Sequence, residues 1–178
     1  LAGSIVGAWT VSAGTQAEGA TVLVFLANGY YFAIDNARES DAPGGVDGFE
    51  RGSYTWNPTT GAVNFTTLLD TNGNLGMSGL NGAAGVNIVV AGNNATVTIP
   101  GKGSIVVNRV TGSSPLVGAW HLGNATVADS SFLVVFLPNG VYFMAVDQAP
   151  GNPNGPDGIE HGTYVWDPVT GAITSSRT

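Results

Sequence analysis

Short runs of β-branched and aromatic residues, separated by turn residues, make up most of the chain. The runs Thr21–Ala27 and Tyr30–Asp35 flank Asn28-Gly29, a pair that accepts positive φ at both positions of a two-residue hairpin turn. The runs Phe49–Trp56 and Ala62–Leu69 flank a longer turn that contains a proline and a glycine. No segment repeats apolar residues at spacings of three and four over ten positions, as an amphipathic helix would. The pattern therefore predicts an antiparallel β-meander.

Further runs complete the strands expected in the first 110 residues, and they are Ser4–Val11, Leu75–Leu80, Val86–Val90, Thr96–Pro100 and Ser104–Val110. A meander of about eight strands can close into a small up-and-down barrel, and closure removes the exposed sheet edges. The expected fold class is all-β, with an antiparallel up-and-down barrel of about eight strands.

The first half of this pattern occurs twice. Residues 5–34 and 116–145 share 13 identities in 30 at an offset of 111, and the segment Val6–Trp9 returns unchanged as Val117–Trp120. After a loop of different length, the match resumes at an offset of 110 with Asp47–Pro58 and Asp157–Pro168. Self-similarity at a fixed period is typical of repeat architectures, and we interpret the chain as a tandem duplication.

The second copy is shorter than the first. We expect a complete barrel repeat over residues 1–111 and an incomplete one over residues 112–178, with the chain an excerpt of a longer array. The five strands expected in the second copy cannot close a barrel of eight. Strands from another polypeptide or from a continuation of this one could complete it, giving a head-to-tail assembly that grows. The alternative is a small open sheet that packs on the first barrel.

Three residues at the two ends of the first copy resemble a family signature. Gly7 and Trp9 on the first strand, with Arg109 on the last, resemble the Gly-x-Trp and terminal Arg of the lipocalin-like (calycin) barrels. The resemblance implies that Trp9 plugs one end of the barrel and that Arg109 stacks across it. Gly118 and Trp120 repeat the first half of the signature. The stretch Asp47–Trp56 is closer to uncharacterised secreted bacterial repeat proteins.

One strand of each copy is apolar at nearly every position rather than at alternate ones. A barrel wall that faces water should alternate, so a wall that is apolar on both sides is covered by something. We expect the next repeat or another chain to cover it. The candidate interface residues are Val22, Val24 and Leu26 in the first copy and Leu133, Val135 and Leu137 in the second.

The composition narrows the classes of function. The chain has 178 residues with five Lys and Arg against twelve Asp and Glu, and only 10% of its residues are charged. Low charge with 43% hydrophobic residues is the reverse of a disordered composition. The absence of cysteine excludes a disulfide scaffold and a Cys-ligated metal. A nucleic-acid partner is not expected, because binding phosphates takes clustered Lys and Arg. No apolar run reaches the ~18 residues that suggest a membrane helix.

Acidic residues gather in two matching loops, where clustered oxygen ligands are what Ca²⁺ requires. The residues that recur in both copies, and form the candidate calcium site, are Asp35, Asp47, Glu50, Asp147, Asp157 and Glu160. Glu39 and Asp41 lie in the first of these loops. The alternative is a solvated loop in which Asp-Gly makes a turn. No other cofactor is expected.

Support for catalysis is thin, because both histidines, His121 and His161, lie in the second copy only. We expect no catalytic residues and treat an enzyme as the minority interpretation. The first hypothesis is a secreted or cell-surface structural or adhesive repeat protein that self-associates through its barrels, in the limit into filaments. The second is an extracellular lipocalin-like protein that binds a small apolar ligand.

Overall fold

The structure, a computed structural model, describes residues 3–11, 20–36, 47–73, 76–122, 131–148 and 157–178. Within these ranges the chain forms antiparallel β-strands in two sheets and one short 3₁₀ turn, with no α-helix. No helix in the described ranges is therefore long and apolar enough to cross a membrane. The all-β, antiparallel class predicted from the sequence is confirmed.

Sheet 1 contains the first eight strands in the order β5-β4-β3-β2-β1-β8-β7-β6. The strands are β1 (Gly7–Thr10), β2 (Ala20–Phe25), β3 (Tyr30–Asn36), β4 (Gly48–Trp56), β5 (Val63–Asp70), β6 (Asn87–Ala91), β7 (Asn94–Ile99) and β8 (Gly103–Arg109). The first strand pairs with the last, and Trp9 lies opposite Arg109 in this ladder. Sheet 1 is thus one continuous up-and-down meander joined between β1 and β8.

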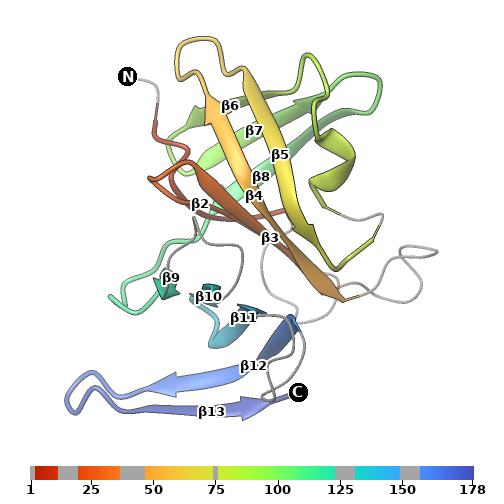
Figure 1. Ribbon diagram of the computed structural model, residues 1–178. Helices are drawn as coiled ribbons and strands as arrows, with labels where there is room; N and C mark the ends of the chain where they lie inside the picture. Colours follow the sequence, from red (N-terminus) through yellow and green to blue (C-terminus); the bar gives the residue numbers. More distant parts are fainter. Residues whose placement is uncertain (1–2, 12–19, 37–46, 74–75, 123–130, 149–156) are drawn as a thin grey trace.

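Sheet 1 curls until its two edge strands touch at one end (Figure 1). The backbone N–H of Ile88 donates to the carbonyl of Gly61 at 2.8 Å, and that of Val63 donates to the carbonyl of Val86 at 3.2 Å. A single antiparallel bridge between Ala62 and Asn87 marks this contact. The result is a barrel-like curled sheet in which a short bridge joins β5 and β6.

The strand expected at Leu75–Leu80 is wrong. Ser78–Leu80 forms the 3₁₀ turn η1, and Leu75 lies outside the described residues. Glycine gives the reason, because Gly76 and Gly82 have φ of +79° and +68°, values that turn the chain and that an extended strand does not contain. The turn places the buried side chains of Met77 and Leu80 inside sheet 1.

Sheet 2 contains five strands in the order β13-β12-β11-β10-β9. They are β9 (Gly118–Leu122), β10 (Ser131–Phe136), β11 (Val141–Asp147), β12 (Gly158–Trp166) and β13 (Ile173–Arg177). Their register is that of β1–β5. Trp9 pairs with Leu23 and Trp120 with Val134, which preserves the offset of 111. Strands β9 and β13 are the edges of this open sheet.

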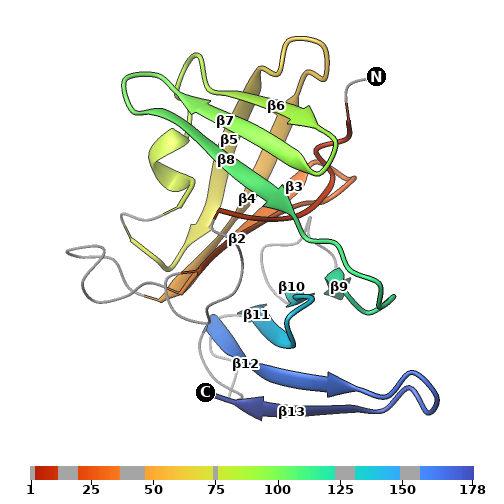
Figure 2. The ribbon, with the colours of Figure 1, turned by 180° about the vertical axis from the view of Figure 1, so that it is seen from behind.

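Two apolar clusters hold the molecule together. The first fills the inside of sheet 1 and includes Trp9, Tyr31 and Phe65. The second lies between the sheets, where the outer side of β2 and β3 meets β10 and β11. Figures 1 and 2 show sheet 2 against this side of sheet 1, with the β12–β13 hairpin farthest from it. The described residues therefore form a curled eight-stranded sheet with a smaller open sheet packed against its outer side.

Candidate functional site: the open inner face of sheet 2

Arg109 closes one end of sheet 1 over Trp9. The Trp9 side chain is fully buried, and the Arg109 guanidinium carbon lies 4.1 Å from the centroid of its ring. The guanidinium donates to the carbonyls of Val6, at 2.7 Å, and Ser4. Trp9 Nε1 donates to the carbonyl of Ile5 at 2.8 Å. This end of sheet 1 is held by a cation–π contact and by hydrogen bonds that tie β8 to the segment before β1.

Gly7 makes room for this closure. Its φ is +130°, and a Cβ at this position would lie 2.8 Å from Arg109 Nη1. Gly118 holds the matched position in sheet 2 with a φ of +133°, but a Cβ there would meet nothing within 4 Å. The backbone at Gly118 thus has the conformation that accommodates Arg109 at Gly7, but the space beside Gly118 is open.

On its two edge strands, the inner face of sheet 2 is exposed where its counterpart in sheet 1 is covered. Trp120 keeps the indole hydrogen bond of Trp9, because its Nε1 donates to the carbonyl of Leu116 at 2.8 Å. Its side chain is nevertheless 47% exposed, against 0% for Trp9. On β13, Ile173 is 48% exposed, against 2% for the matched Val63. Large apolar side chains gathered on one open face are typical of an interaction surface.

Along β10 and β11, the opposite, outer face of sheet 2 is buried against sheet 1. One cluster contains the matched pairs Val22 and Leu133, Val24 and Val135, Leu26 and Leu137, and Phe32 and Phe143. All of these are fully or nearly buried except Leu26, which is partly buried. The residues named from the sequence as an interface therefore lie together, and the two sheets meet through equivalent walls.

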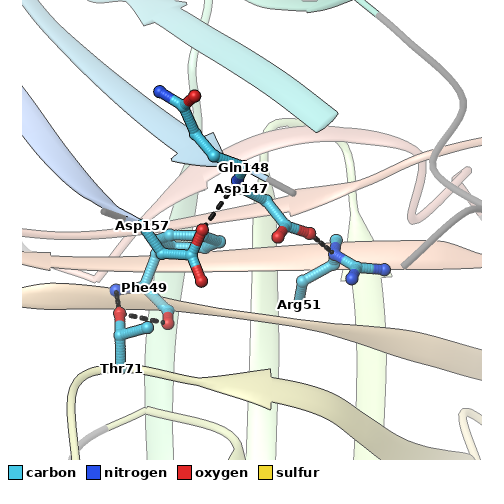
Figure 3. A network of polar contacts seen from close by, with 6 residues as sticks. All are labelled: Phe49, Arg51, Thr71, Asp147, Gln148 and Asp157. Carbon is cyan, nitrogen blue, oxygen red and sulfur yellow. Dashed lines mark hydrogen bonds and ion pairs between the residues drawn. The ribbon is translucent and has the colours of Figure 1, made fainter. Parts of the chain in front are cut away.

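A buried ion pair crosses this interface (Figure 3). Arg51 Nε of β4 lies 2.6 Å from Asp147 Oδ2 of β11, and each side chain is 2% exposed. Beside the pair, Asp157 Oδ1 accepts a hydrogen bond from the backbone N–H of Gln148 at 2.6 Å. In the same region Thr71 Oγ1 exchanges hydrogen bonds with the backbone of Phe49. A buried pair of this kind favours one orientation of the two surfaces, because a shift of either surface would separate the opposite charges.

The repeat of the acidic residues in the sequence suggests that Asp35 and Asp147 are equivalent, and the strand register corrects this match. Ala20 pairs with Asn36 in sheet 1 and Ser131 pairs with Asp147 in sheet 2, so Asp147 occupies the place of Asn36. A shift of one residue along a strand moves a side chain to the other face of the sheet. Asp147 faces the interface for this reason, while Asp35 accepts hydrogen bonds from Thr21 Oγ1 and Asn72 Nδ2.

Glu50 is the most deeply buried carboxyl group of the candidate calcium site. The backbone N–H of Met77 lies 2.9 and 2.8 Å from its two oxygens, so Glu50 supports the turn η1. Burial is the main cause that raises the pKa of Glu50 to about 7, and the neighbouring charges of Asp70 and Asp35 raise it further. Hydrogen bonds from the backbone of Ser78 and Met77 oppose this increase. Burial likewise raises the pKa of Asp35.

The remaining carboxylates of the candidate calcium site do not converge. Asp47 is exposed at the start of β4, while Glu160 accepts a hydrogen bond from Tyr142 Oη at 2.7 Å and lies 3.5 Å from Arg177 Nη1. Among the residues that the structure describes, no three His, Asp or Glu side chains form a metal-binding group. Glu39 and Asp41 lie outside the described residues.

The two histidines lie beside aromatic rings at the interface side of sheet 2. The ring of His121 lies 5.8 Å from that of Phe32, and burial lowers the pKa of His121. The ring of His161 lies 6.1 Å from that of Phe143. Both positions are occupied by different residues in sheet 1, Thr10 and Arg51. These contacts are those of packed interface residues.

Sequence reasoning did not identify Arg51 as an interface residue. The available signal was an arginine two residues after Phe49 on the face of β4 that packs against sheet 2.

Comparison with models of protein families, with curated proteins and with solved structures found no match. The geometry of the chain itself therefore carries the functional argument.

Proposed function

We propose that this chain is a structural or adhesive module of a repeat protein, in which calycin-like barrel repeats associate through their sheets at the cell surface or outside the cell. The observation that carries the proposal is the contrast between the two inner faces. Trp9 and Val63 are covered in sheet 1, whereas Trp120 and Ile173, on the two edge strands of sheet 2, are about half exposed.

Two physical arguments support association. Burying a large apolar side chain contributes ~1.5–3 kcal/mol, so covering the inner face of sheet 2 is favourable. Edge strands present unpaired backbone N–H and C=O groups that add strands from another chain. The outer walls already join two sheets within one molecule, which leaves the inner face and the edges of sheet 2 for contacts between molecules.

Sedimentation velocity across a range of protein concentrations tests this function, with negative-stain microscopy of the same samples. We expect larger species that increase with concentration, because a contact between unlike surfaces repeats from molecule to molecule. Trp120→Asp should reduce these species, because it places a charge on the inner face. Val165→Asp is the matched control, since Val165 is exposed on the other side of β12. A single monomeric species at every concentration would contradict the proposal.

A carrier for a small apolar ligand is the second candidate function. A shallow hollow lined by Val117, Tyr164 and Trp166 lies beside the inner face of sheet 2 and favours it. The interior of sheet 1 argues against it, because packed side chains fill that space. A thermal-shift screen with fatty acids separates the candidates, since a carrier gains stability as the ligand concentration rises above Kd.

A further inference from the structure

The first five strands of sheet 1 and the five strands of sheet 2 have the same register, but only sheet 1 has a strand paired with the outer edge of its first strand. In sheet 1, β8 pairs with β1 so that Arg109 lies opposite Trp9 and Asn108 opposite Thr10. The backbone N–H of Val110 extends this ladder by donating to the carbonyl of Ala8 at 2.8 Å. In sheet 2, β9 is an edge, and no described strand lies at the place of β8.

Each part that receives Arg109 in sheet 1 has a counterpart around β9. The indole of Trp120 is held by the carbonyl of Leu116 as Trp9 is held by that of Ile5. Gly118 has the positive φ of Gly7 and open space where Gly7 meets the guanidinium. The carbonyls of Pro115 and Val117 match those of Ser4 and Val6, the acceptors for Arg109.

The wider inner face shows the same difference. Trp56 Nε1 donates to the carbonyl of Ile88 on β6 at 2.9 Å, and Glu50 accepts from the backbone of η1. These partners belong to the segment that covers the inside of sheet 1, residues 76–110. The matched Glu160 instead contacts Tyr142 and Arg177 of sheet 2 itself.

We propose that β9 and the inner face of sheet 2 form a docking site for an added β-strand of the β8 type. Its occupant is an extended segment with alternating apolar residues and an arginine that reaches the ring of Trp120. The strand pairs antiparallel with β9, the guanidinium lies over the indole beside Gly118, and the apolar residues cover the inner face. This inference rests on the proposed function and names the partner chemistry for its open sheet.

Charge and geometry both favour a strand that carries an arginine over a strand without one. The chain has a formal net charge of −7, so an incoming cation is attracted. An arginine also satisfies the two carbonyls and the ring face together, which a neutral strand cannot do. The pairing of Arg109 with Trp9 in sheet 1 defines the expected register of the added strand against β9, with its arginine opposite Trp120.

A synthetic peptide with the sequence of residues 86–110 provides the probe. It contains no tryptophan, so the tryptophan fluorescence of the full chain reports on binding alone. Titration is done below the concentration at which the chain self-associates. We expect one peptide per chain, a blue shift of the emission and weaker acrylamide quenching as Trp120 becomes covered. The same peptide with Arg109→Ala should have a Kd at least about tenfold higher, because it loses the charge-assisted hydrogen bonds and the cation–π contact of the arginine.

Variants of the chain locate the site. Trp120→Ala should abolish the effect of the arginine, so that both peptides bind equally weakly. Val165→Thr, on the exposed opposite side of β12, should bind both peptides as the native chain does. Circular dichroism and the unfolding midpoint establish that each variant is folded.

Three results would overturn the inference. They are no binding of the peptide, equal binding of the Arg and Ala peptides to the native chain, and native-like discrimination between them by Trp120→Ala. Each is distinguishable from failure of the proposed function, which is measured by sedimentation of the chain without peptide. If the chain self-associates but does not bind the peptide, the proposed function stands and the docking site is wrong. If the chain is monomeric but binds the peptide as expected, the docking site stands and the proposed function is wrong.

Discussion

Glu50 and Glu160 occupy matched positions on β4 and β12 but have different surroundings. Glu50 is fully buried and accepts hydrogen bonds from η1, whereas Glu160 is partly exposed beside Arg177. The difference follows from what covers each inner face rather than from the residue itself. A carboxyl group buried in this way is easier to protonate, because burial disfavours its charged form.

The contribution of Glu50 to the stability of the fold should therefore fall as the pH rises from about 4.5 to about 7. Burial raises the pKa of Glu50 from 4.5 to about 7, so the unfolded chain loses this proton first while the folded chain retains it. This contribution to the free energy of unfolding then decreases over the window by about 1–3 kcal/mol and levels off above it. Asp35, whose pKa is raised as well, contributes in the same direction. His121, whose pKa is lowered by burial, contributes in the opposite direction just below its ordinary value of 6.5. Urea unfolding at a series of pH values measures the profile.

Glu50→Gln is the variant that isolates this residue. It retains an amide oxygen for the N–H of Met77 and removes the titration, so most of the decrease between pH 4.5 and 7 should disappear. Glu160→Gln, the same substitution at the matched position of sheet 2, is the control variant. If the pH profiles of the free energy of unfolding are parallel for the native chain and Glu50→Gln, Glu50 is not the buried carboxyl group that causes the decrease.

The candidate residues differ in how far the sequence could predict their positions. Trp9 and Arg109 could be placed together because the first and last strands of a closed meander are neighbours. The pairing of Arg51 with Asp147 could not, because it depends on how two sheets dock and on a one-residue difference in register. Short-range patterns contain no information about either.

At the scale of single elements, β1 and β9 are equivalent strands, but β1 has a paired strand on both sides and β9 has one on a single side. Both begin at a glycine with φ near +130°, and both hold a tryptophan through an indole hydrogen bond. Only β1 has β8 beside it. The glycine is required at Gly7 by the backbone conformation and by the guanidinium together, whereas at Gly118 the conformation alone requires it.

Gly7→Ala should destabilise the chain more than Gly118→Ala. Each variant forces alanine into a left-handed conformation at a cost of about 1–3 kcal/mol. Gly7→Ala also displaces Arg109, which adds about 1 kcal/mol or more from its lost contacts. Urea unfolding of the two variants under identical conditions measures the difference. Equal losses would mean that Arg109 does not depend on the space above Gly7.

The strands themselves were largely predictable, because hairpin turns and alternating apolar residues are local signals. The segment at Leu75–Leu80 was not, since its leucines and methionine resemble a strand while its glycines determine the turn. Its role became visible only with Glu50, which lies far away in sequence and accepts the N–H of Met77. Contacts of this kind decide an ambiguous apolar run, and they are long-range.

At the scale of the whole molecule, the doubly apolar strands have a simple explanation. One side of β2 faces the inside of sheet 1, and the other faces β10 and β11. Sequence reasoning predicted a cover for this wall but left open whether another chain provides it. In the structure the cover is the matched wall of sheet 2, so the equivalent faces of the two sheets bury each other.

This wall-to-wall packing is the central claim, because it leaves the inner face of sheet 2 as the free surface. A double-mutant cycle on Arg51 and Asp147 tests it most directly, at concentrations where the chain is monomeric. Arg51→Met or Asp147→Ala should each cost about 3–5 kcal/mol, because each removes one partner of a buried ion pair. The double variant should lose much less than the sum, with a coupling of about 1–3 kcal/mol.

The exposed pair Glu160 and Arg177 provides the control cycle, with an expected coupling of about 1 kcal/mol or less. Strong coupling between Arg51 and Asp147 in the monomer is the result that the packing of the two sheets predicts. Small and additive losses at Arg51 and Asp147, no larger than those of the control pair, would contradict it.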